Sequence, residues 1–219
     1  MQTANRQTIA VLDYGMGNLR SVSKALEHVA PQARVIVTDR REIIQAADRV
    51  VVPGQGAARD CMAALRRHSL VDVLGQAYRD KPFLGICMGL QVLFAHSEEN
   101  AGTACLGLVP GEVRAFAEPL LEAPGGARLK VPHMGWNQVW QKPHPLWEGI
   151  DDGARFYFVH SYYVDPADAA VAVGRCHYGG HFTCAIARDN VFACQFHPEK
   201  SAADGLRLLR NFVHWDGRL

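Results

Sequence analysis

Residues 81–91 read KPFLGICMGLQ, a short apolar strand that runs into Cys87 and then directly into a helix. Gly85 and Gly89 stand two residues before and two residues after this cysteine. The spacing is that of a nucleophile elbow with sulfur in place of oxygen, because glycine fits where the strand and helix backbones crowd the turn. Such a turn presents the thiol beside a helix N-terminus, where the helix dipole favours a thiolate and free N–H groups can hold an oxyanion.

The segments before the elbow alternate between strand and helix signals. Buried strands are expected at residues 8–14, 33–38 and 48–53. Helices are expected after Asn18, which suits an N-cap, at residues 41–47, in a long region up to about Arg79, and at residues 88–96. Near-continuous apolar strands that alternate with helices predict an α/β fold, with a mostly parallel central sheet and helices on both faces.

The second half of the chain changes character. Shorter strands with turns between them are expected at residues 109–116, 129–140, 154–164, 170–177, 183–188 and 191–195. Asp189 and Asn190 mark a tight reversal, and residues 118–128 are the best loop candidate. Residues 201–215 close the chain as an amphipathic helix. We therefore expect a smaller antiparallel strand region in this half.

Residues 192–201 read FACQFHPEKS, which ends a strand and begins the last helix. His197 stands at the strand end, and Glu199 follows two residues later. In an extended segment such residues project to the same side, so the Glu199 carboxylate is expected to hold the imidazole. The imidazole in turn is expected to face Cys87, which would assemble a nucleophile, a base and an orienting acid.

Composition places the chain among ordinary soluble globular proteins. Its 219 residues are 48% hydrophobic and 21% charged, with a formal net charge of +1, which offers no basic footprint for nucleic acid. We expect a single domain over residues 1–219, with residues 1–7 as a flexible lead-in, and no membrane span. Six scattered cysteines without a CxxC pair, in a chain without a secretory leader, favour a cytoplasmic location over disulfides.

Four motifs lie in order along the chain: DYGMGNL at residues 13–19, GICMGLQ at 85–91, HMGWN at 133–137 and FYFVHSY at 156–162. The pairing of Gly-x-Cys-x-Gly with a distant His-Pro-Glu resembles the class I glutamine amidotransferases. Together the four motifs look like the glutaminase subunits of imidazole glycerol phosphate synthase, from histidine biosynthesis. The resemblance implies the three-layer, flavodoxin-like fold of that family, and neither a cofactor nor a metal.

The same resemblance implies the chemistry. Cys87 attacks the side-chain amide of glutamine, His197 relays the proton and Glu199 orients His197. A thioester forms and ammonia leaves, and water then hydrolyses the thioester to glutamate. The oxyanion is held by the backbone N–H of Met88 and by one from the PGQG loop, where Gly54 suits a peptide that turns over to present its N–H.

Four further residues are implied to bind the substrate. Gln91 and Glu99 meet the polar end of glutamine, since a carboxylate suits the substrate ammonium. Glu98 stays open as the alternative to Glu99, because relatives often carry more acid where this chain has Ala95 and His96. The backbone of Ser161 and Tyr162 is expected to line the pocket.

The resemblance also implies a heterodimer with a (β/α)₈-barrel cyclase subunit. Ammonia released into neutral water is mostly protonated and loses the lone pair that attacks, so it must pass directly into the cyclase site. The partner is expected to meet the turn at residues 13–19 and the HMGWN motif, with Trp136 as an anchor. The interface residues implied are Asn18, His133, Met134, Trp136 and Asn137.

Other interpretations compete with these. A nucleotide site at Gly15-Met16-Gly17 is disfavoured because Arg20 stands where a dinucleotide fingerprint needs glycine. A zinc site is disfavoured by the loose spacing of its possible ligands, Cys176, His177, His181, Cys184 and Cys194. An amidotransferase for anthranilate, aminobenzoate or pyridoxal phosphate synthesis also stays open, as does a scaffold that binds partners without catalysis.

Overall fold

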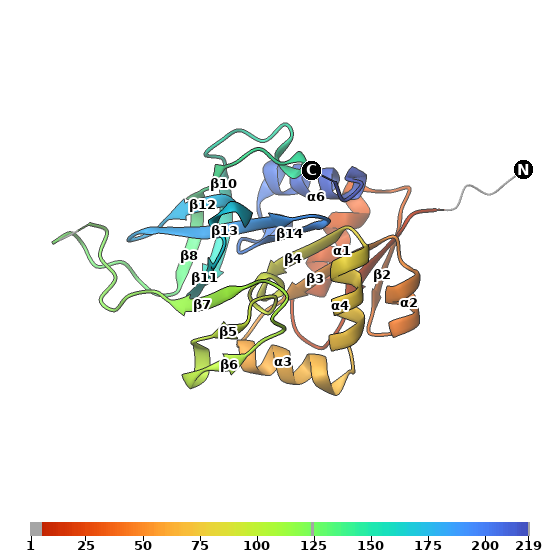
Figure 1. The fold of residues 1–219 in the computed structure, drawn as a ribbon. Coiled ribbons are helices and arrows are strands. Elements are labelled where there is room, and N and C mark those ends of the chain that lie inside the picture. Colours follow the sequence, from red (N-terminus) through yellow and green to blue (C-terminus); the bar gives the residue numbers. More distant parts are fainter. Residues whose placement is uncertain (1–5, 124, 219) are drawn as a thin grey trace, which may run out of the picture.

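The structure is a computed structural model that describes residues 6–123 and 125–218, and strands make up much of it (Figure 1). The strands of the first half are β1 (Thr8–Leu12), β2 (Arg34–Thr38), β3 (Arg49–Gly54), β4 (Phe83–Cys87), β5 (His96–Ser97) and β6 (Thr103–Ala104). Those of the second half are β7 (Gly111–Ala115), β8 (His133–Gln138), β9 (Trp140–Gln141), β10 (Arg155–His160), β11 (Tyr162–Pro166), β12 (Ala172–His177), β13 (His181–Arg188) and β14 (Val191–Cys194).

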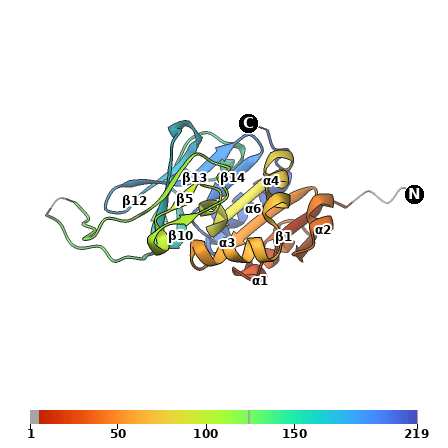
Figure 2. The same ribbon diagram turned by 60° about the horizontal axis from the view of Figure 1, so that its bottom comes forward.

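The helices belong mainly to the two ends of the chain. The α-helices are α1 (Leu19–Val29), α2 (Arg41–Ala46), α3 (Ala58–Arg67), α4 (Val71–Asp80), α5 (Met88–Gln91) and α6 (Ala202–His214). Short 3₁₀ turns are η1 (Glu99–Ala101), η2 (Pro145–Trp147), η3 (Ala169–Val171) and η4 (Pro198–Lys200). Helices α1 to α4 gather at one end of the molecule, and β12 and β13 extend at the other (Figure 2).

The large sheet has the strand order β2-β1-β3-β4-β14-β13-β11-β7-β5-β6, with β12 beside β13 and β9 beside β12. The strands from β2 to β14 in this order pair in parallel. Strands β13, β11 and β7 continue it antiparallel. The predicted α/β fold with an antiparallel second half is therefore confirmed. The last strand of the chain, β14, lies directly beside β4, the strand of the elbow.

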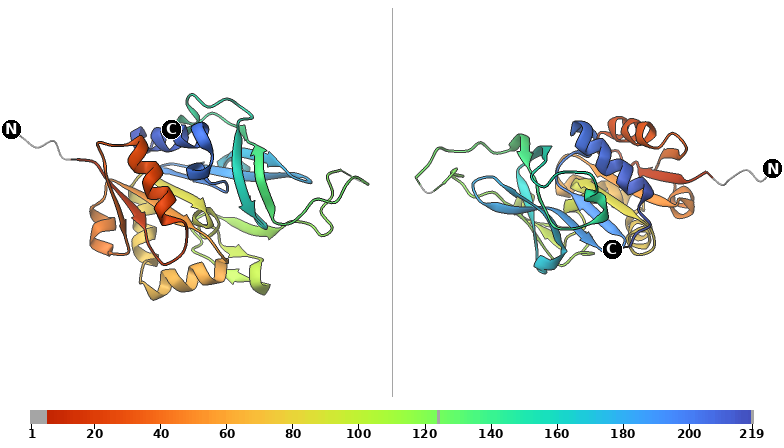
Figure 3. Two further views of the ribbon diagram at one scale, coloured as in Figure 1. Left: turned by 180° about the vertical axis from the view of Figure 1, so that it is seen from behind. Right: turned by 90° about the horizontal axis from the view of Figure 1, so that it is seen from above.

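Alternate residues of the central strands feed two hydrophobic cores, one on each face of the sheet. In β1, Ile9 and Val11 pack with residues of α1 and α6. Ala10 and Leu12 pack on the other face with residues of α2, α3 and α4. Helices α1 and α6 lie side by side on the face of the sheet that is turned toward the viewer in Figure 3 (left). This three-layer packing holds the carboxyl ends of β3, β4 and β14 in one place.

Two predicted strands are each divided between two sheets. Residues 154–164 form β10 and β11, and residues 129–140 contain β8 and β9. Strands β8 and β10 pair only with each other, in an antiparallel two-stranded sheet, whereas β9 and β11 belong to the large sheet. The chain changes sheets at Ser161 and Val139. Alternating apolar residues predict a strand but do not say which sheet it joins.

Two predicted helices are also shorter than expected. The region up to Arg79 breaks into α3 and α4 at Ser69, which has a left-handed φ of 55°. The helix predicted at residues 88–96 ends at Gln91, because backbone N–H groups of residues 106–109 take the carbonyls of Val92, Leu93 and Phe94 that a longer helix would use. His96 lies instead in β5.

Some expectations concern the ends and loops. Asn18 is confirmed as the N-cap of α1, since its side chain accepts a hydrogen bond from the Ser21 N–H. Arg6 and Gln7, expected in the lead-in, donate hydrogen bonds to backbone carbonyls of residues 31, 32 and 213, and residues 1–5 lie outside the described residues. Residues 118–123 and 125–128 lie in the predicted loop, where Leu121 and Arg128 form a bridge. No helix in residues 6–123 or 125–218 is long and apolar enough to cross a membrane.

Candidate active site

Cys87 ends β4 and begins α5, and its backbone is strained. Its φ of 55° and ψ of −107° lie in a region that residues with a side chain rarely adopt. A Cβ on Gly89 would lie 1.8 Å from the Val52 carbonyl oxygen, and one on Gly85 would lie 2.5 Å from that of Gly89. Both glycines are therefore required by contact with backbone, as a nucleophile elbow predicts.

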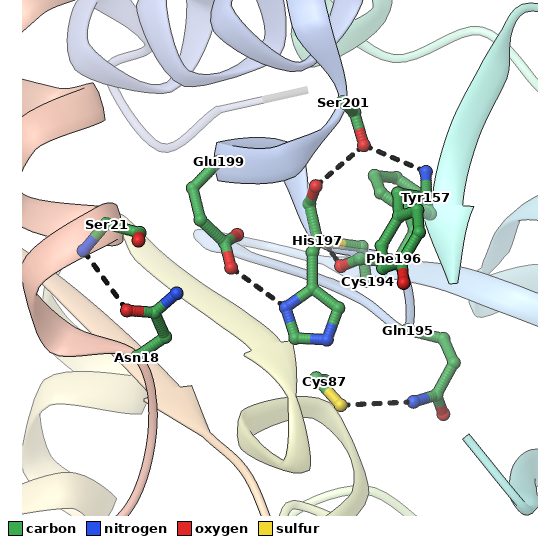
Figure 4. A network of polar contacts seen from close by, with 10 residues as sticks. All are labelled: Asn18, Ser21, Cys87, Tyr157, Cys194, Gln195, Phe196, His197, Glu199 and Ser201. Carbon is green, nitrogen blue, oxygen red and sulfur yellow. Dashed lines mark hydrogen bonds and ion pairs between the residues drawn. The ribbon is translucent and has the colours of Figure 1, made fainter. Parts of the chain in front are cut away.

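His197 reaches Cys87 because β14 and β4 are parallel neighbours. Cys194 pairs with Ile86, so the chain beyond β14 passes over the elbow. In Figure 4 the imidazole stands directly over the sulfur. Its Nε2 atom faces the sulfur and has no nitrogen or oxygen partner among the described residues. The two side chains are brought together by strand order, although 110 positions (197 − 87) separate them in the sequence.

Glu199 holds the imidazole from the other side. Its Oε1 atom lies 2.9 Å from Nδ1 of His197, and both side chains are almost completely buried. The predicted reason was wrong, because Glu199 lies in the 3₁₀ turn η4 rather than in an extended segment. The turn instead folds the carboxylate back toward the ring. Two further bonds fix the histidine backbone: its N–H donates to the Tyr157 carbonyl, and its carbonyl accepts from the Ser201 hydroxyl.

The ionisation of His197 follows from these neighbours. Burial lowers its pKa, but hydrogen bonding and charge from Cys87 and Glu199 outweigh this effect and raise the pKa to about 9. The imidazole therefore holds a proton at neutral pH. An imidazole beside a cysteine sulfur, with a carboxylate on its other nitrogen, is the arrangement of a nucleophile with its base.

A cavity of about 500 Å³ opens beside the sulfur. It is lined by both sequence-predicted substrate groups, Gln91 and Glu99, and by Ser161 and Tyr162. Lys200 and Tyr157, which sequence reasoning did not select, also line it. The Lys200 ammonium lies 5.9 Å from the centre of the Tyr157 ring. The cavity thus offers both signs of charge, as recognition of a zwitterionic amino acid requires.

Glu98 and Glu99 differ in where their carboxylates lie. Glu99 lines the cavity and accepts a hydrogen bond of 2.6 Å from the backbone N–H of Ala58, at the start of α3. Glu98 accepts from the N–H of Ala115 and is not among the lining residues. The geometry therefore favours Glu99 over Glu98 as the carboxylate that meets a substrate.

Gln91 is already engaged through its amide nitrogen. Its Nε2 atom donates to the Tyr162 carbonyl at 3.2 Å and to Oε1 of Gln195 at 2.9 Å. An amide nitrogen has two N–H donors, so both are used, and the side-chain oxygen is the group left to meet a substrate. That oxygen can only accept hydrogen bonds.

The proposed oxyanion donors lie next to the sulfur. Met88 follows Cys87 at the start of α5, and Gly54 pairs with Cys87 in the register of β3 and β4. A Cβ on Gly54 would lie 2.3 Å from the Tyr14 hydroxyl and 2.7 Å from Cβ of Met88. Close packing is thus a sufficient reason for glycine at this position.

The residues implied for a partner interface fall into two groups. Met134 and Trp136 are 64% and 48% exposed on the outer face of β8. His133 faces inward and is 3% exposed, and Asn137 is held by hydrogen bonds to His133 and to the His177 carbonyl. Asn18 caps α1. Of these five residues, Met134 and Trp136 are the ones with large apolar side chains that are exposed.

Gln195 contacts the sulfur and was missed by sequence reasoning. Its Nε2 atom lies 3.6 Å from Sγ of Cys87, and the residue is fully buried. A signal was available, because Gln195 precedes His197 by two positions at a strand end, and such residues project to the same side.

The other cysteines and histidines do not form a second centre. The six cysteines are all free thiols. Within residues 6–123 and 125–218, no three His, Cys, Asp or Glu side chains gather to hold a metal ion. Burial raises the pKa of Cys61 and Cys176 to about 12 and that of Cys105 to about 11, which keeps these thiols neutral.

The sequence of the chain is similar to a known family and to individual proteins. The profile of the family described as glutamine amidotransferase class-I matches residues 10–215. Imidazole glycerol phosphate synthase subunit HisH from Dechloromonas aromatica is 62% identical over 209 residues, which cover 95% of this chain and 97% of that protein. Subunit HisH from Pseudomonas putida is 57% identical over 213 residues, with 97% and 99% covered.

Solved structures agree at the level of the fold. PurLQS from Thermotoga maritima superposes with a TM-score of 0.71 at 18% identity, covering 95% of this chain and 98% of that one. A chain described as glutamine amidotransferase superposes with a TM-score of 0.69 at 18% identity, covering 94% and 97%.

Proposed function

Because the chain belongs to the class I glutamine amidotransferases, and among them to the HisH glutaminase subunits of imidazole glycerol phosphate synthase in histidine biosynthesis, we propose that Cys87, His197 and Glu199 hydrolyse L-glutamine to glutamate and ammonia. The observation that carries this proposal is the position of the His197 imidazole over the Cys87 sulfur, with the Glu199 carboxylate 2.9 Å from its other ring nitrogen. A cavity of amino-acid size opens beside the sulfur.

The reaction begins when the Cys87 sulfur attacks the side-chain amide carbon of glutamine. The amide oxygen becomes an oxyanion, which the backbone N–H of Met88 and one from the Gly54 peptide are positioned to hold. His197 gives its proton to the amide nitrogen as the carbon–nitrogen bond breaks, so ammonia leaves and a thioester remains.

Hydrolysis of the thioester restores the enzyme. His197, now neutral, takes a proton from the attacking water, the carbon–sulfur bond breaks, and the sulfur leaves as an anion. Glutamate is released and the imidazole is protonated again. Through both steps Glu199 keeps the ring orientation and the tautomer, because it accepts from Nδ1.

Recognition of glutamine rests on the cavity wall. The carboxylate of Glu99 binds the substrate ammonium, and the free side-chain oxygen of Gln91 accepts from a substrate N–H group. The backbone of Ser161 and Tyr162 lies along the substrate. Glu99 gains rigidity for this role from its hydrogen bond to the N–H of Ala58.

We propose that the partner is the (β/α)₈-barrel cyclase subunit of the synthase. The outer face of β8 and β10 carries Met134 and Trp136 next to Tyr157, whose ring centre lies 6.2 Å from that of Trp136. Tyr157 also lines the active-site cavity, so this apolar face is continuous with the place where ammonia forms. A cyclase docked here would receive ammonia before bulk water protonates it.

We also propose that residues 1–219 form one domain in a reducing, cytoplasmic setting. One large sheet and two cores that share it support the single domain. The six free thiols suit a compartment that keeps thiols reduced.

The test is glutamate formation by the purified chain, alone and mixed with the cyclase subunit or with the synthase subunit of an anthranilate-type enzyme. We expect hydrolysis to rise with the cyclase and its nucleotide substrate only. A rise with the anthranilate-type partner would assign the chain to the other amidotransferase branch. Glutamine hydrolysis absent under every condition would favour the scaffold interpretation.

A further inference from the structure

The side chain of Gln195 lies against the reacting sulfur and is itself immobilised. Its amide nitrogen is 3.6 Å from Sγ of Cys87 (Figure 4), and its amide oxygen accepts from Gln91 at 2.9 Å. Its backbone N–H donates to the Cys184 carbonyl in β13. Gln195 is fully buried and Gln91 is 2% exposed, and the amide nitrogen of Gln91 is bonded to protein oxygens.

The Tyr162 carbonyl joins this pair of amides to a second group of buried side chains. It accepts from Nε2 of Gln91 at 3.2 Å and from Nδ1 of His160 at 2.8 Å. A carbonyl can only accept, so Nδ1 of His160 carries the hydrogen. Burial lowers the pKa of His160 to about 3, which keeps the ring neutral and makes its Nε2 atom an acceptor.

The direction of the next hydrogen bonds follows. Nδ1 of His133 lies 2.9 Å from Nε2 of His160 and must therefore donate. Burial lowers the pKa of His133 to about 4, so its Nε2 atom accepts, and the side-chain nitrogen of Asn137 donates to it at 3.2 Å. The second N–H of Asn137 donates to the His177 carbonyl at 2.9 Å. Every ring and amide hydrogen in this series of hydrogen bonds is therefore assigned to one nitrogen atom.

We propose that Gln195 positions the Cys87 sulfur and stabilises its anion, and that the hydrogen-bonded series Asn137–His133–His160–Tyr162–Gln91 holds Gln195 in that place. An amide N–H stabilises a thiolate by donating to it and cannot accept from a thiol, so the contact favours the nucleophilic form. The proposal rests on Cys87 as the nucleophile of the proposed function. It gives Gln91 a positioning role in addition to its contact with substrate.

The chain of hydrogen bonds also reaches the surface proposed for the partner. His133 and Asn137 point inward from β8, and Trp136 points outward from the same strand. A series of hydrogen bonds therefore couples the position of β8 to the position of the Cys87 sulfur. Each donor N–H in this series has an acceptor. This explains why β8 carries the buried His133 at a position where an apolar residue would pack without a desolvation cost.

The experiment compares Gln195→Met, Gln195→Glu and a matched control, Asn211→Leu, which removes a distant amide that bonds the Leu146 and Glu148 carbonyls. Alkylation of Cys87 by iodoacetamide is followed by peptide mass spectrometry, with an added cysteine peptide as reference. Glutamine kcat and KM are measured with the cyclase subunit present. Far-UV circular dichroism establishes which variants fold.

We expect Gln195→Met to slow Cys87 alkylation and to lower kcat by about tenfold to a hundredfold, with KM changed by less than about threefold. Gln195→Glu keeps the acceptor for Gln91 but places a carboxylate by the sulfur, so it should slow alkylation at least as much, and it decides the matter if the methionine variant does not fold. Asn211→Leu should alkylate at the wild-type rate.

Substitutions of His160 test the rest of the hydrogen-bonded series. His160→Asn keeps a donor near the Tyr162 carbonyl and should retain alkylation within about threefold of wild type, whereas His160→Leu should lose about tenfold or more. Wild-type alkylation of Cys87 in a folded Gln195 variant would overturn the proposal. Fast alkylation of wild-type Cys87 without any glutamine hydrolysis would refute the proposed function instead.

Discussion

Nδ1 of His197 lies 2.9 Å from Oε1 of Glu199, and a single proline separates the two residues in the chain. The 3₁₀ turn that begins at Pro198 makes this contact possible. The geometry leaves Nε2 of His197 free to face Cys87. The ionisation of His197 therefore depends on Glu199 and Cys87 together.

Replacement of this carboxylate should change the pH dependence. Glu199→Gln removes a charge that helps to raise the pKa of His197 to about 9, so we expect that pKa to fall and kcat to decrease by about tenfold or more. The alkaline limb of kcat should move to lower pH. Titration of the imidazole by NMR measures the pKa directly, and the exposed Glu27→Gln is the control.

The raised pKa of His197 also affects the stability of the folded protein. The folded-state pKa of His197 is raised from 6.5 to about 9, so its contribution to the free energy of unfolding is complete below pH 6.5 and is lost as the pH rises through about 9. Glu199→Gln should shrink this loss. Urea unfolding at pH 7 and pH 10 measures the loss of unfolding free energy. An equal loss in the wild type and in Glu199→Gln would contradict the role of Glu199 in raising the pKa of His197.

The buried histidines of the second half should make the protein sensitive to acid. Burial lowers the pKa of His133 and His144 to about 4 and that of His160 to about 3. The unfolded chain then binds more protons, so the free energy of unfolding should decrease below pH 6.5, by up to about 1.4 kcal/mol per pH unit for each histidine.

Urea unfolding between pH 6.5 and 4.5 measures that slope. His197 adds nothing to it, because its own contribution is already complete below pH 6.5. His144→Gln should reduce the slope without touching the active site, since the His144 Nδ1 atom only accepts from the Leu146 N–H. A free energy that stays constant down to pH 5 would show that these rings are protonated in the folded state.

The elbow should tolerate no side chain at position 89. Gly89→Ala places a Cβ 1.8 Å from the Val52 carbonyl oxygen, which is backbone and cannot rotate away, so we expect a loss of about 3 kcal/mol or more in the free energy of unfolding. Gly180→Ala is the matched control, because a Cβ there meets nothing within 4 Å. Equal stability of the two variants would mean that α5 moves away from β3 easily.

Trp136 and Trp140 offer a matched pair for the partner surface. Both are 48% exposed, but only Trp136 lies on β8 next to Tyr157. Trp136→Ala should weaken cyclase binding by about 2 kcal/mol or more and change the melting temperature little. Trp140→Ala should bind as wild type in the same calorimetric titration. The reverse result would move the interface to β9.

Cys87 should be the one thiol that a glutamine-like electrophile modifies. Burial keeps the pKa of Cys61, Cys105 and Cys176 near 11 to 12, so these thiols stay neutral at pH 7.5. Cys87→Ala should abolish ammonia release and leave cyclase binding intact. Peptide mapping identifies the labelled residue, and hydrolysis that survives the substitution would exclude the thioester mechanism.

Local patterns predicted much of the fold. Apolar runs and turn residues located β1 to β4 and most later strands, because a strand of a doubly covered sheet is apolar throughout. The errors lie where distant segments compete for backbone groups. The helix after Cys87 stops at Gln91 because residues 106–109 take its carbonyls, and no pattern within residues 88–96 reveals that competitor.

The amino-acid sequence by itself determined the elbow at Cys87, the His-Pro-Glu motif and the family, since glycine spacing and short motifs depend only on chain neighbours. Tertiary structure alone decided that β14 lies beside β4, that His133 points inward while Trp136 points outward, and that Glu99 rather than Glu98 lines the cavity. It also decided that Gln195 contacts the sulfur. The reason is physical: strand register sets which face each side chain takes, and buried hydrogen bonds join residues that are far apart in the chain.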